Sequence, residues 1–345
     1  MCRRGRVCVW DNLKCILIFL VVVGHFVNQF EDESAIMRSI SIMIYSFHMP
    51  LFIFLSGLLE RRWDKDRAFS WNKPVYYILI GYLLKVAIFA IKIFFGRDAE
   101  FSFFSDTGCP WYMFAMSAFM VLAYILQDAD WHLVLPVSIL ASCLAGYVPE
   151  IGSFLYLSRI LVFFPFYYVG FLMRPEKVRQ FLHNKYHKYM KAGAFVVLAG
   201  VAFVSLIWID DIYSYIRLLT GRNAYVFINI DSCGAWHRLA YYGISVVIGT
   251  AVMSLVPDRN LSLAGVIGQR TLQIYFWHRL VLYVLMYSGF ADWIKETLPC
   301  LWISAYLLIA VILTLALALN LFGLPLKYLK QCEMRIGRRL AAAVH

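Results

Sequence analysis

The sequence predicts an all-α integral membrane protein, a bundle of about ten transmembrane helices with both termini in the cytoplasm. Three observations support this prediction. Of the 345 residues, 62% are hydrophobic and only 15% are charged, a far more apolar composition than that of soluble domains. The apolar residues gather in runs of spanning length, about 17 to 25 residues. Lys and Arg gather in alternate connecting segments, which is the pattern of the positive-inside rule.

Ten apolar runs are long enough to span the membrane, and each is expected to form a helix. They lie near residues 12–30, 37–59, 74–96, 111–127, 132–148, 157–173, 191–209, 239–256, 266–287 and 300–323. The first run follows the basic start "MCRRGR", as the apolar part of a signal peptide would. No small-residue cleavage site follows it, and it contains the polar residues His25, Asn28 and Gln29. We therefore expect it to remain in the membrane.

The distribution of basic residues sets the expected orientation. Most of the 32 Lys and Arg residues lie in segments on the side of the amino terminus. The opposite side holds the acidic stretch "EDES" and few basic residues, which are Arg38, Arg97, Arg217, Arg222, Arg238 and Lys295. Cytoplasmic loops carry the excess of Lys and Arg, so both termini are predicted to be cytoplasmic. Residues 1–345 are expected to form a single transmembrane domain with no fused extracytoplasmic domain, because no polar, periodic stretch could bury a separate aqueous core.

Composition and motifs argue against several function classes. The net charge of +11 follows from the loop asymmetry, and no basic and aromatic groove indicates nucleic-acid binding. No P-loop, dinucleotide fingerprint, zinc-protease or hydrolase motif is present. The eight cysteines are scattered and indicate neither a metal site nor a cysteine nucleophile. Three are expected in outward-facing loops, where two could form a disulfide: Cys109, Cys233 and Cys300.

Ionisable side chains inside the predicted spans are the strongest functional signal. Each costs about 2.5 to 3.5 kcal/mol on insertion scales, so each needs a reason. They are Lys14, His25, His48, Lys85, Lys92, Arg159, His278 and Arg279, with Asp11 at the cytoplasmic end of the first span. An interior that is basic without matching acids suits an anionic ligand that enters from the cytoplasm.

Lys14 and His25 lie on one face of the first predicted helix. Eleven positions separate them, which is three turns plus roughly 20° and about 16 Å along the helix axis. Asp11 and Asn28 lie on the same stripe. Two structural interpretations remain open, since Lys14 could extend to the headgroups and His25 could make a hydrogen bond between helices.

The second span contains a proline, which predicts a kinked helix. Pro50 removes one helix hydrogen bond and clashes with the carbonyl of Ser46, which should be left free beside His48. Ser56 and Gly57 let another backbone approach closely. Packing alone explains these small residues and the proline, whereas His48 beside the kink is well placed to face a polar cavity.

Two later spans carry further candidates. Arg159 lies near the outer end of the sixth span and cannot lose its charge. It must therefore pair with a carboxylate, carbonyl or phosphate, or extend outward. In the ninth span, Tyr275 lies three residues before His278 and shares its face. Lys85 and Lys92 share a face of the third span, and no role is assigned to them.

Two outward-facing segments could contact a sugar. One delivers Trp111 to the start of the fourth span. The other, residues 210–238, is rich in Tyr, contains Trp236 and is long enough to hold an interfacial helix or lid. Aromatic residues at a membrane interface usually form a belt, and the alternative is that these rings stack on a carbohydrate.

These stretches together resemble the acyltransferase-3 family of membrane acyltransferases, most closely its fucose 4-O-acetylase-like branch. The family's basic residue, ten intervening residues and histidine correspond to Lys14 and His25 in "DNLKCILIFLVVVGH". Further similar stretches are "SFHMPLFIFLSG" at 46–57, "WY" at 111–112, "RILVFFPFYYVG" at 159–170 and "IGQRTLQIYFWH" at 267–278. The likeness runs in order through nearly the whole chain.

This resemblance implies a ten-helix bundle that moves an acyl group, usually acetyl, from cytoplasmic coenzyme A to a carbohydrate hydroxyl at or beyond the outer face. His25 corresponds to the family's essential histidine, and Lys14 to its partner basic residue. Some members carry a fused extracytoplasmic hydrolase-like domain. Its expected absence here favours delivery to a lipid-linked or membrane-proximal glycan. The resemblance lies with bacterial envelope enzymes, which implies a bacterial plasma membrane.

The residues suit this chemistry. Lys14 would hold the phosphates of acetyl-CoA, with Asp11 as a second candidate for cofactor binding. His25, deeper on the same face, would act as a general base. Further catalytic candidates, which would donate to the oxyanion, are His48, Arg159 and His278. The candidates for substrate binding are Trp111, Tyr275 and Trp236. Direct transfer and an acyl-histidine intermediate both remain open.

The expected partners are acyl-CoA, a carbohydrate or glycolipid acceptor and the lipid bilayer, with no metal and no nucleic acid. The main alternative is a multi-pass transporter or flippase of an anionic or sugar-linked substrate, which would also use buried basic residues near a kinked helix. The sequence shows no internal symmetry of the kind that transporters often have. A non-catalytic scaffold would leave the intramembrane basic residues without a purpose.

Overall fold

The computed structural model describes residues 7–60, 69–105, 108–152 and 154–331. Within these ranges the chain is helical, and the pairing of extended backbone is limited to an isolated bridge between Ser105 and Phe154. The basic stretches at 1–6, 61–68 and 332–345, on which the expected orientation partly rests, lie outside the described residues.

The helices follow the order of the predicted runs, and each run lies on at least one helix. Their bounds are α1 Cys8–Val27, α2 Ala35–Tyr45, α3 His48–Leu58, α4 Asn72–Phe94, α5 Trp111–Leu126, α6 Trp131–Ala145, α7 Leu157–Leu172, α8 Pro175–Leu182, α9 His187–Ile207, α10 Ile209–Ile212, α11 Ile216–Leu219, α12 Gly234–Leu255, α13 Ser262–Gly268, α14 Thr271–Tyr287, α15 Phe290–Thr297 and α16 Trp302–Leu317. Short 3-10 turns lie at Pro149–Ile151, Tyr213–Tyr215, Tyr225–Ile228 and Asn320–Gly323.

Five helices in the described part of the chain are long and apolar enough to cross a membrane. They are α1, the joined helices α2 and α3, α4, α9 and α12. Two bent pairs raise this number to seven: α7 with α8, at 89°, and α16 with Asn320–Gln331, at 65°. Helices α5 and α6 are apolar but shorter. The chain is therefore a multi-pass membrane protein, while the number of ten spans and the location of the termini stay predictions.

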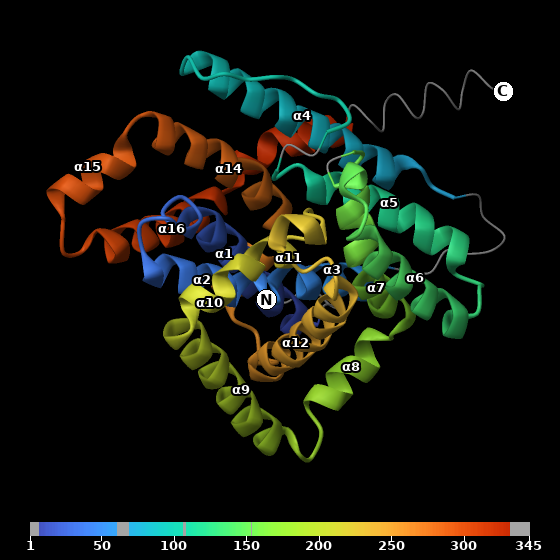
Figure 1. The fold of residues 1–345 in the computed structure, drawn as a ribbon. Helices are drawn as coiled ribbons and strands as arrows, with labels where there is room; N and C mark the ends of the chain where they lie inside the picture. Colours follow the sequence, from blue (N-terminus) through green and yellow to red (C-terminus); the bar gives the residue numbers. More distant parts are fainter. Residues whose placement is uncertain (1–6, 61–68, 106–107, 153, 332–345) are drawn as a thin grey trace, which may run out of the picture.

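Helix α1 lies in the interior of the bundle, and the site is built around it. It packs against α2, α3, α13, α14 and α16, whereas Figure 1 shows α4, α9 and α15 at the periphery. At its start, Gly268 of α13 touches the backbone of Asp11 so closely that a Cβ there would collide with it. These contacts on several sides fix the direction and position of α1.

Helices α3 and α7 meet backbone to backbone through glycine. A Cβ at Gly57 of α3 would collide with the carbonyl oxygen of Tyr167, and a Cβ at Gly170 of α7 would collide with that of Phe54. This confirms the expectation that the small residues at 56 and 57 admit another backbone. Without a hydrophobic drive between helices in lipid, such close van der Waals packing is a main source of association.

The second span is interrupted, as its proline predicts. Helix α2 ends at Tyr45 and α3 begins at His48. The carbonyl of Ser46 lies at the break and accepts a hydrogen bond of 2.6 Å from the Ser245 hydroxyl of α12. The carbonyl that the proline releases is thus satisfied by a neighbouring helix, which membrane proteins require.

The segment 210–238 forms short helical turns rather than an extended loop. Helices α10 and α11 pack against α2, so the segment holds helices as expected, while their place at a membrane interface stays a prediction. Arg238 differs from expectation, because it lies inside α12 and is fully buried instead of marking an outer loop. Its guanidinium donates to the carbonyl of Leu218 at 2.8 Å and lies over the rings of Tyr225 and Tyr241.

The glycine contact predicts a specific sensitivity. Gly57→Ala should force α3 and α7 apart and lower the free energy of unfolding by about 1–3 kcal/mol, the usual cost of overpacking. The midpoint of thermal unfolding in detergent measures this change. Gly193→Ala on α9 is the matched control, since its added Cβ would meet no atom within 4 Å and alanine favours a helix. Equal midpoints for both variants would contradict the close contact.

Candidate active site

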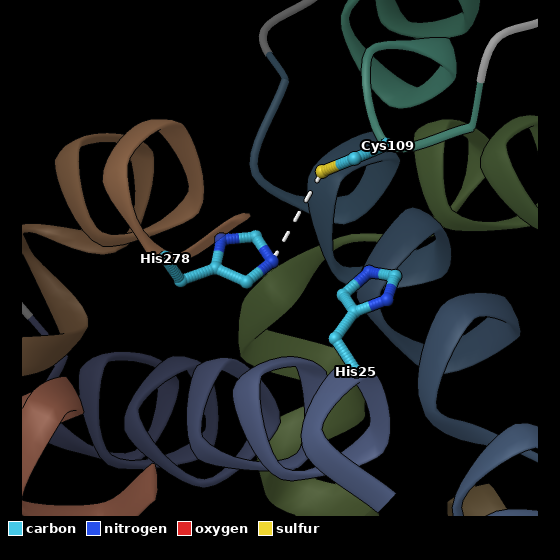
Figure 2. A group of neighbouring side chains, drawn as sticks. All are labelled: His25, Cys109 and His278. Carbon is cyan, nitrogen blue, oxygen red and sulfur yellow. Dashed lines mark hydrogen bonds between the residues drawn. The ribbon is translucent and has the colours of Figure 1, made fainter. Parts of the chain in front are cut away.

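Two histidines and a cysteine from distant parts of the chain meet in the interior. His25 lies near the end of α1, His278 lies in α14, and Cys109 precedes α5 (Figure 2). Each offers a ring nitrogen or sulfur, and these atoms all lie within 4.8 Å of one another. The two imidazoles stack with centroids 5.2 Å apart, and the Cys109 Sγ lies 4.0 Å from the Nε2 of His278. We call these three residues the His–Cys cluster.

Backbone carbonyls fix the orientation of His278. Its Nδ1 lies 2.7 Å from the carbonyl oxygen of Tyr275 and 3.2 Å from that of Ile274. A carbonyl only accepts hydrogen bonds, so the Nδ1 of the neutral ring carries the proton and the Nε2 keeps its lone pair. That lone pair is on the nitrogen that faces Cys109. His278 is therefore built to accept a proton or a hydrogen bond inside the cluster.

His25 is held differently. Its ring makes no hydrogen bond with the described residues and remains partly accessible, whereas His278 is fully buried. Below the ring, the backbone carbonyl of His25 accepts from Gln29 at 3.1 Å. Asn28, at the end of α1, donates to the Tyr45 hydroxyl at 2.7 Å. The helix end is thus fixed, and neither imidazole nitrogen of His25 is hydrogen-bonded to a described residue.

Arg159 and Trp111 form a stacked pair near the cluster. The Arg159 guanidinium lies 4.8 Å from the centre of the Trp111 ring, and that ring also stacks on Phe163 at 5.2 Å. The charges of Arg159 and of Arg279 reach the ring of His25. Because two side chains already pack on the ring of Trp111, this residue fits the positioning of Arg159 better than stacking on a sugar.

Tyr275 connects α14 to the segment that carries the cysteine. Its hydroxyl donates to the backbone carbonyl of Cys109, and its ring lies 5.5 Å from that of His278 and 5.2 Å from that of Tyr112. The hydroxyl proton is engaged in this bond. Tyr275 therefore positions Cys109 in this structure.

Lys85, for which the sequence suggested no role, anchors the same segment. Its ammonium donates to the carbonyls of Ser102, Phe103 and Ser105 at 2.8, 3.1 and 2.9 Å, and it lies 5.2 Å from the centre of the Tyr156 ring. An ammonium has three protons to donate, so these bonds repay part of the cost of its burial. Lys85 thereby holds the chain that leads to Cys109.

The candidates for coenzyme A lie at the opposite end of α1. The Lys14 ammonium is 3.4 Å from a carboxylate oxygen of Asp11, and Gln269 donates to the other oxygen at 3.1 Å. The side chain of Lys14 keeps 28% of its surface exposed. Next to them, Asn12 donates to the carbonyls of Pro257 and Arg259 at 2.8 and 2.9 Å. The start of α1 is therefore tied to the α12–α13 connection.

Among the described residues, the other candidates make no hydrogen bond or ring contact with the His–Cys cluster, although His48 interacts electrostatically with His25. The Nδ1 of His48 lies 2.7 Å from the Ile44 carbonyl at the break in the second span. Trp236 is 74% exposed on α12, and no ring contact among the described residues joins it to the cluster. A cavity of about 1050 Å³ is lined mainly by apolar side chains of α3, α6, α7, α8 and α12, and no candidate catalytic residue lines it.

Sequence reasoning missed two members of the site. Cys109 was considered only for a disulfide, and Cys109, Cys233 and Cys300 form no disulfide with one another. Arg279 is half-buried beside Tyr283, with its guanidinium 4.5 Å from the ring centre and a 3.2 Å bond to the hydroxyl. The sequence does contain a signal for Arg279. It directly follows His278 inside a predicted span, and an arginine cannot lose its charge there.

Known proteins with similar sequences agree with an acyl-transfer site. Residues 9–319 match the acyltransferase-3 family, described as an acyltransferase domain. The nodulation protein NolL of Sinorhizobium fredii (strain NBRC 101917 / NGR234) is 27% identical over 237 residues. That region covers 64% of this chain and 63% of NolL, so the chain spans less than two thirds of that relative's length. No solved structure matches the chain.

The family match extends from the first helix to Leu319, just after α16. It therefore includes every residue of the His–Cys cluster and the Lys14 end of α1, and it favours acyl transfer over the transporter alternative. This multi-pass membrane protein belongs to the acyltransferase-3 family.

Proposed function

We propose that this chain transfers an acetyl or other short acyl group from cytoplasmic acyl-CoA to a hydroxyl of a cell-envelope carbohydrate, such as a lipid-linked sugar, an exopolysaccharide or a surface glycan. The accessible ring of His25 carries the proposal, because it lies at one end of α1 and Lys14 lies toward the other. We place the protein in the fucose 4-O-acetylase-like branch and in the bacterial plasma membrane. Family membership supports the acyl transfer itself.

His25 is the proposed general base. Its neutral imidazole takes the proton of the acceptor hydroxyl while the hydroxyl oxygen attacks the thioester carbonyl, and the bond between the carbonyl carbon and the sulfur of coenzyme A then breaks. Base catalysis of this kind contributes about 10² to 10⁴ in rate. The stacked ring of His278 holds the His25 ring in place.

Cationic groups would stabilise the oxyanion that forms during attack. The positive charges of Arg159 and Arg279, which lie on different helices, both interact with His25. An aromatic ring packs against each guanidinium and orients it. Fixed donors of this type lower the barrier because they need no reorganisation during the reaction. His48 does not fit this role when its ring is neutral, because its Nδ1 donates to the Ile44 carbonyl and its Nε2 is then an acceptor.

Lys14 is the proposed phosphate ligand for coenzyme A. It lies eleven residues before His25, about 16 Å along α1, and the long arm of coenzyme A would cross this distance. Asp11 also contacts Gln269, so its carboxylate would hold the Lys14 ammonium rather than contact a phosphate. The acceptor would approach from the other end of α1, with exposed Trp236 as a candidate surface for a sugar.

Loss of the base should stop transfer. His25→Ala is expected to lower the rate of acetyl transfer by about 10² to 10⁴. Purified protein in nanodiscs is incubated with radiolabelled acetyl-CoA and a membrane glycolipid extract, and the label in the glycolipid is counted. His132→Ala is the control, since it removes an exposed histidine whose partner is Asp130, and it should keep the wild-type rate. Undiminished transfer by His25→Ala would rule out its role as the base.

Loss of the phosphate ligand should weaken donor binding. Lys14→Ala is expected to raise the Kd for coenzyme A about tenfold or more, because a hydrogen bond to a charged group contributes about 1.5–3 kcal/mol. Lys14→Arg keeps the positive charge and should therefore lose less affinity for coenzyme A. Calorimetric titration with coenzyme A measures all three proteins, with Lys92→Ala as a control for general loss of positive charge. Equal affinities for wild type, Lys14→Ala and Lys14→Arg would dismiss the phosphate role.

A further inference from the structure

We propose that Cys109 carries the acyl group as a thioester between coenzyme A and the carbohydrate acceptor. This inference rests on the proposed function and divides its transfer into two steps. It assigns a nucleophile to the His–Cys cluster, whose sulfur and imidazole nitrogens lie within 4.8 Å of one another. A nucleophile within reach of a base that is itself held by a third group is the usual arrangement for covalent catalysis.

The geometry supplies both the nucleophile and its base. The Cys109 sulfur lies 4.0 Å from the Nε2 of His278, and the contacts of Nδ1 with backbone carbonyls leave the lone pair of Nε2 on the side of the thiol. His25 stacks against His278 (Figure 2). The thiol thus has one imidazole to take its proton, and a second, more accessible imidazole lies beside it for the acceptor.

The position of the sulfur is fixed from two sides. The Tyr275 hydroxyl donates to the carbonyl of Cys109, and Lys85 holds three carbonyls of the preceding segment. Trp111, two residues later, packs on Phe163. Burial of polar groups such as the Lys85 ammonium costs free energy. A cysteine that only fills space would not need its backbone held by such groups. These contacts hold the backbone that carries the thiol, and nucleophilic attack requires such orientation.

Nearby charge favours the reactive form of the thiol. Arg279 interacts electrostatically with Cys109 and with His25. The thiolate is the nucleophilic form of cysteine, and cationic neighbours stabilise it. The same guanidinium would stabilise the oxyanion formed on the acyl carbonyl.

Both steps balance. In the first, the Nε2 of His278 takes the thiol proton, and the Cys109 sulfur attacks the carbonyl carbon of the acyl-CoA. The bond from that carbon to the coenzyme A sulfur breaks, and the departing thiolate takes the proton from His278. In the second, His25 takes the proton of the acceptor hydroxyl, whose oxygen attacks the Cys109 thioester. The carbon–sulfur bond breaks, and the Cys109 thiolate recovers a proton from His25 as the ester is released.

A cysteine suits a donor and an acceptor on opposite sides of the bilayer. Exchange of one thioester for another is nearly neutral in free energy, so the acyl group keeps its reactivity for the second step. Donor and acceptor then need not meet in the cluster at the same time. Cys109 is 5% exposed and His278 is fully buried, and exclusion of water protects a reactive intermediate from hydrolysis.

The same three side chains could instead bind a thiophilic metal ion such as Zn²⁺, which prefers thiolate and imidazole ligands. The charges of two arginines near His25 oppose an added cation, whereas they favour a thiolate and an oxyanion. The structure therefore favours the acyl carrier over the metal site. Metal binding is a distinct outcome of the test.

The experiment traps the intermediate. Wild-type protein in nanodiscs is mixed with radiolabelled acetyl-CoA without acceptor, quenched in acid and denatured, and the label on the protein is counted. We expect about one label per chain, released by neutral hydroxylamine and mapped by mass spectrometry to the peptide that contains Cys109. Addition of the membrane glycolipid extract before the quench should move the label to the glycolipid.

Two variants sharpen the result. Cys109→Ala should carry no label on the protein, and its transfer rate should fall at least tenfold. An unchanged Kd for coenzyme A would show that the variant is folded. Cys143→Ala is the matched control, a buried cysteine that contacts the carbonyl of Ala235 and no histidine, and it should retain both label and transfer.

Contrary outcomes are distinguishable. Glycolipid labelling by wild type without any label at Cys109, or full transfer by Cys109→Ala, would overturn the carrier and leave the proposed function standing. A label that maps to His25 would likewise overturn it. One zinc per chain that is lost in Cys109→Ala, together with no acyl label, would make the cluster a metal site. Failure of wild type to label either protein or glycolipid would count against the proposed function itself.

Discussion

The requirement that polar groups buried at membrane depth find partners inside the protein governs this structure. Lys85 meets it with three backbone carbonyls, and Arg238 meets it with the Leu218 carbonyl and two aromatic rings. His278 faces two carbonyls. Other buried atoms lack a hydrogen-bond partner, among them Nε and Nη2 of Arg238 and the hydroxyl of Tyr167. His25 differs from these in being partly exposed, and its ring makes no hydrogen bond with the described residues. The combination of partial exposure and free hydrogen-bonding capacity makes His25 the group that we expect a ligand to reach.

Close helix packing fixes the helix that carries His25. Gly268 brings α13 against the start of α1, Asn12 holds the connection before α13, and Asn28 ties the far end to Tyr45. Helix α1 is therefore constrained at both ends, and the interval between Lys14 and His25 is set by helix geometry rather than by loops. A substrate that binds to both residues would be held by a single rigid helix. This favours precise placement of its reactive carbon.

Much of the helix arrangement was predictable from the sequence, because apolar runs and the polar residues, prolines and glycines within them mark particular positions. Apolar runs located the helices, Pro50 located the break before His48, and Gly57 located the contact with α7. The number of membrane spans was harder to predict from the sequence. Bends such as the 89° turn between α7 and α8 depend on tertiary packing. The partnership of Cys109 with His278 joins residues 169 positions apart. A single cysteine in a loop has no periodicity, so no local pattern could reveal it. The burial of Arg238 escaped for the same reason, because its partner carbonyl lies in a segment that folds back onto the helices.

The arrangement of the cluster also bears on how one chain could serve two aqueous compartments without opening a path between them. His25 alone would require donor thioester and acceptor hydroxyl to meet at one ring, with both sides of the bundle open together. In the cluster, the accessible His25 lies beside the buried Cys109 and His278, so an acyl group could leave the donor before the acceptor arrives. Lys85 and Tyr275 hold the cysteine from the segment before α5 and from α14, on elements separate from α1. In the proposed mechanism, α1 would position the donor and a separately anchored segment would hold the carrier, which gives a reason for the burial of Lys85.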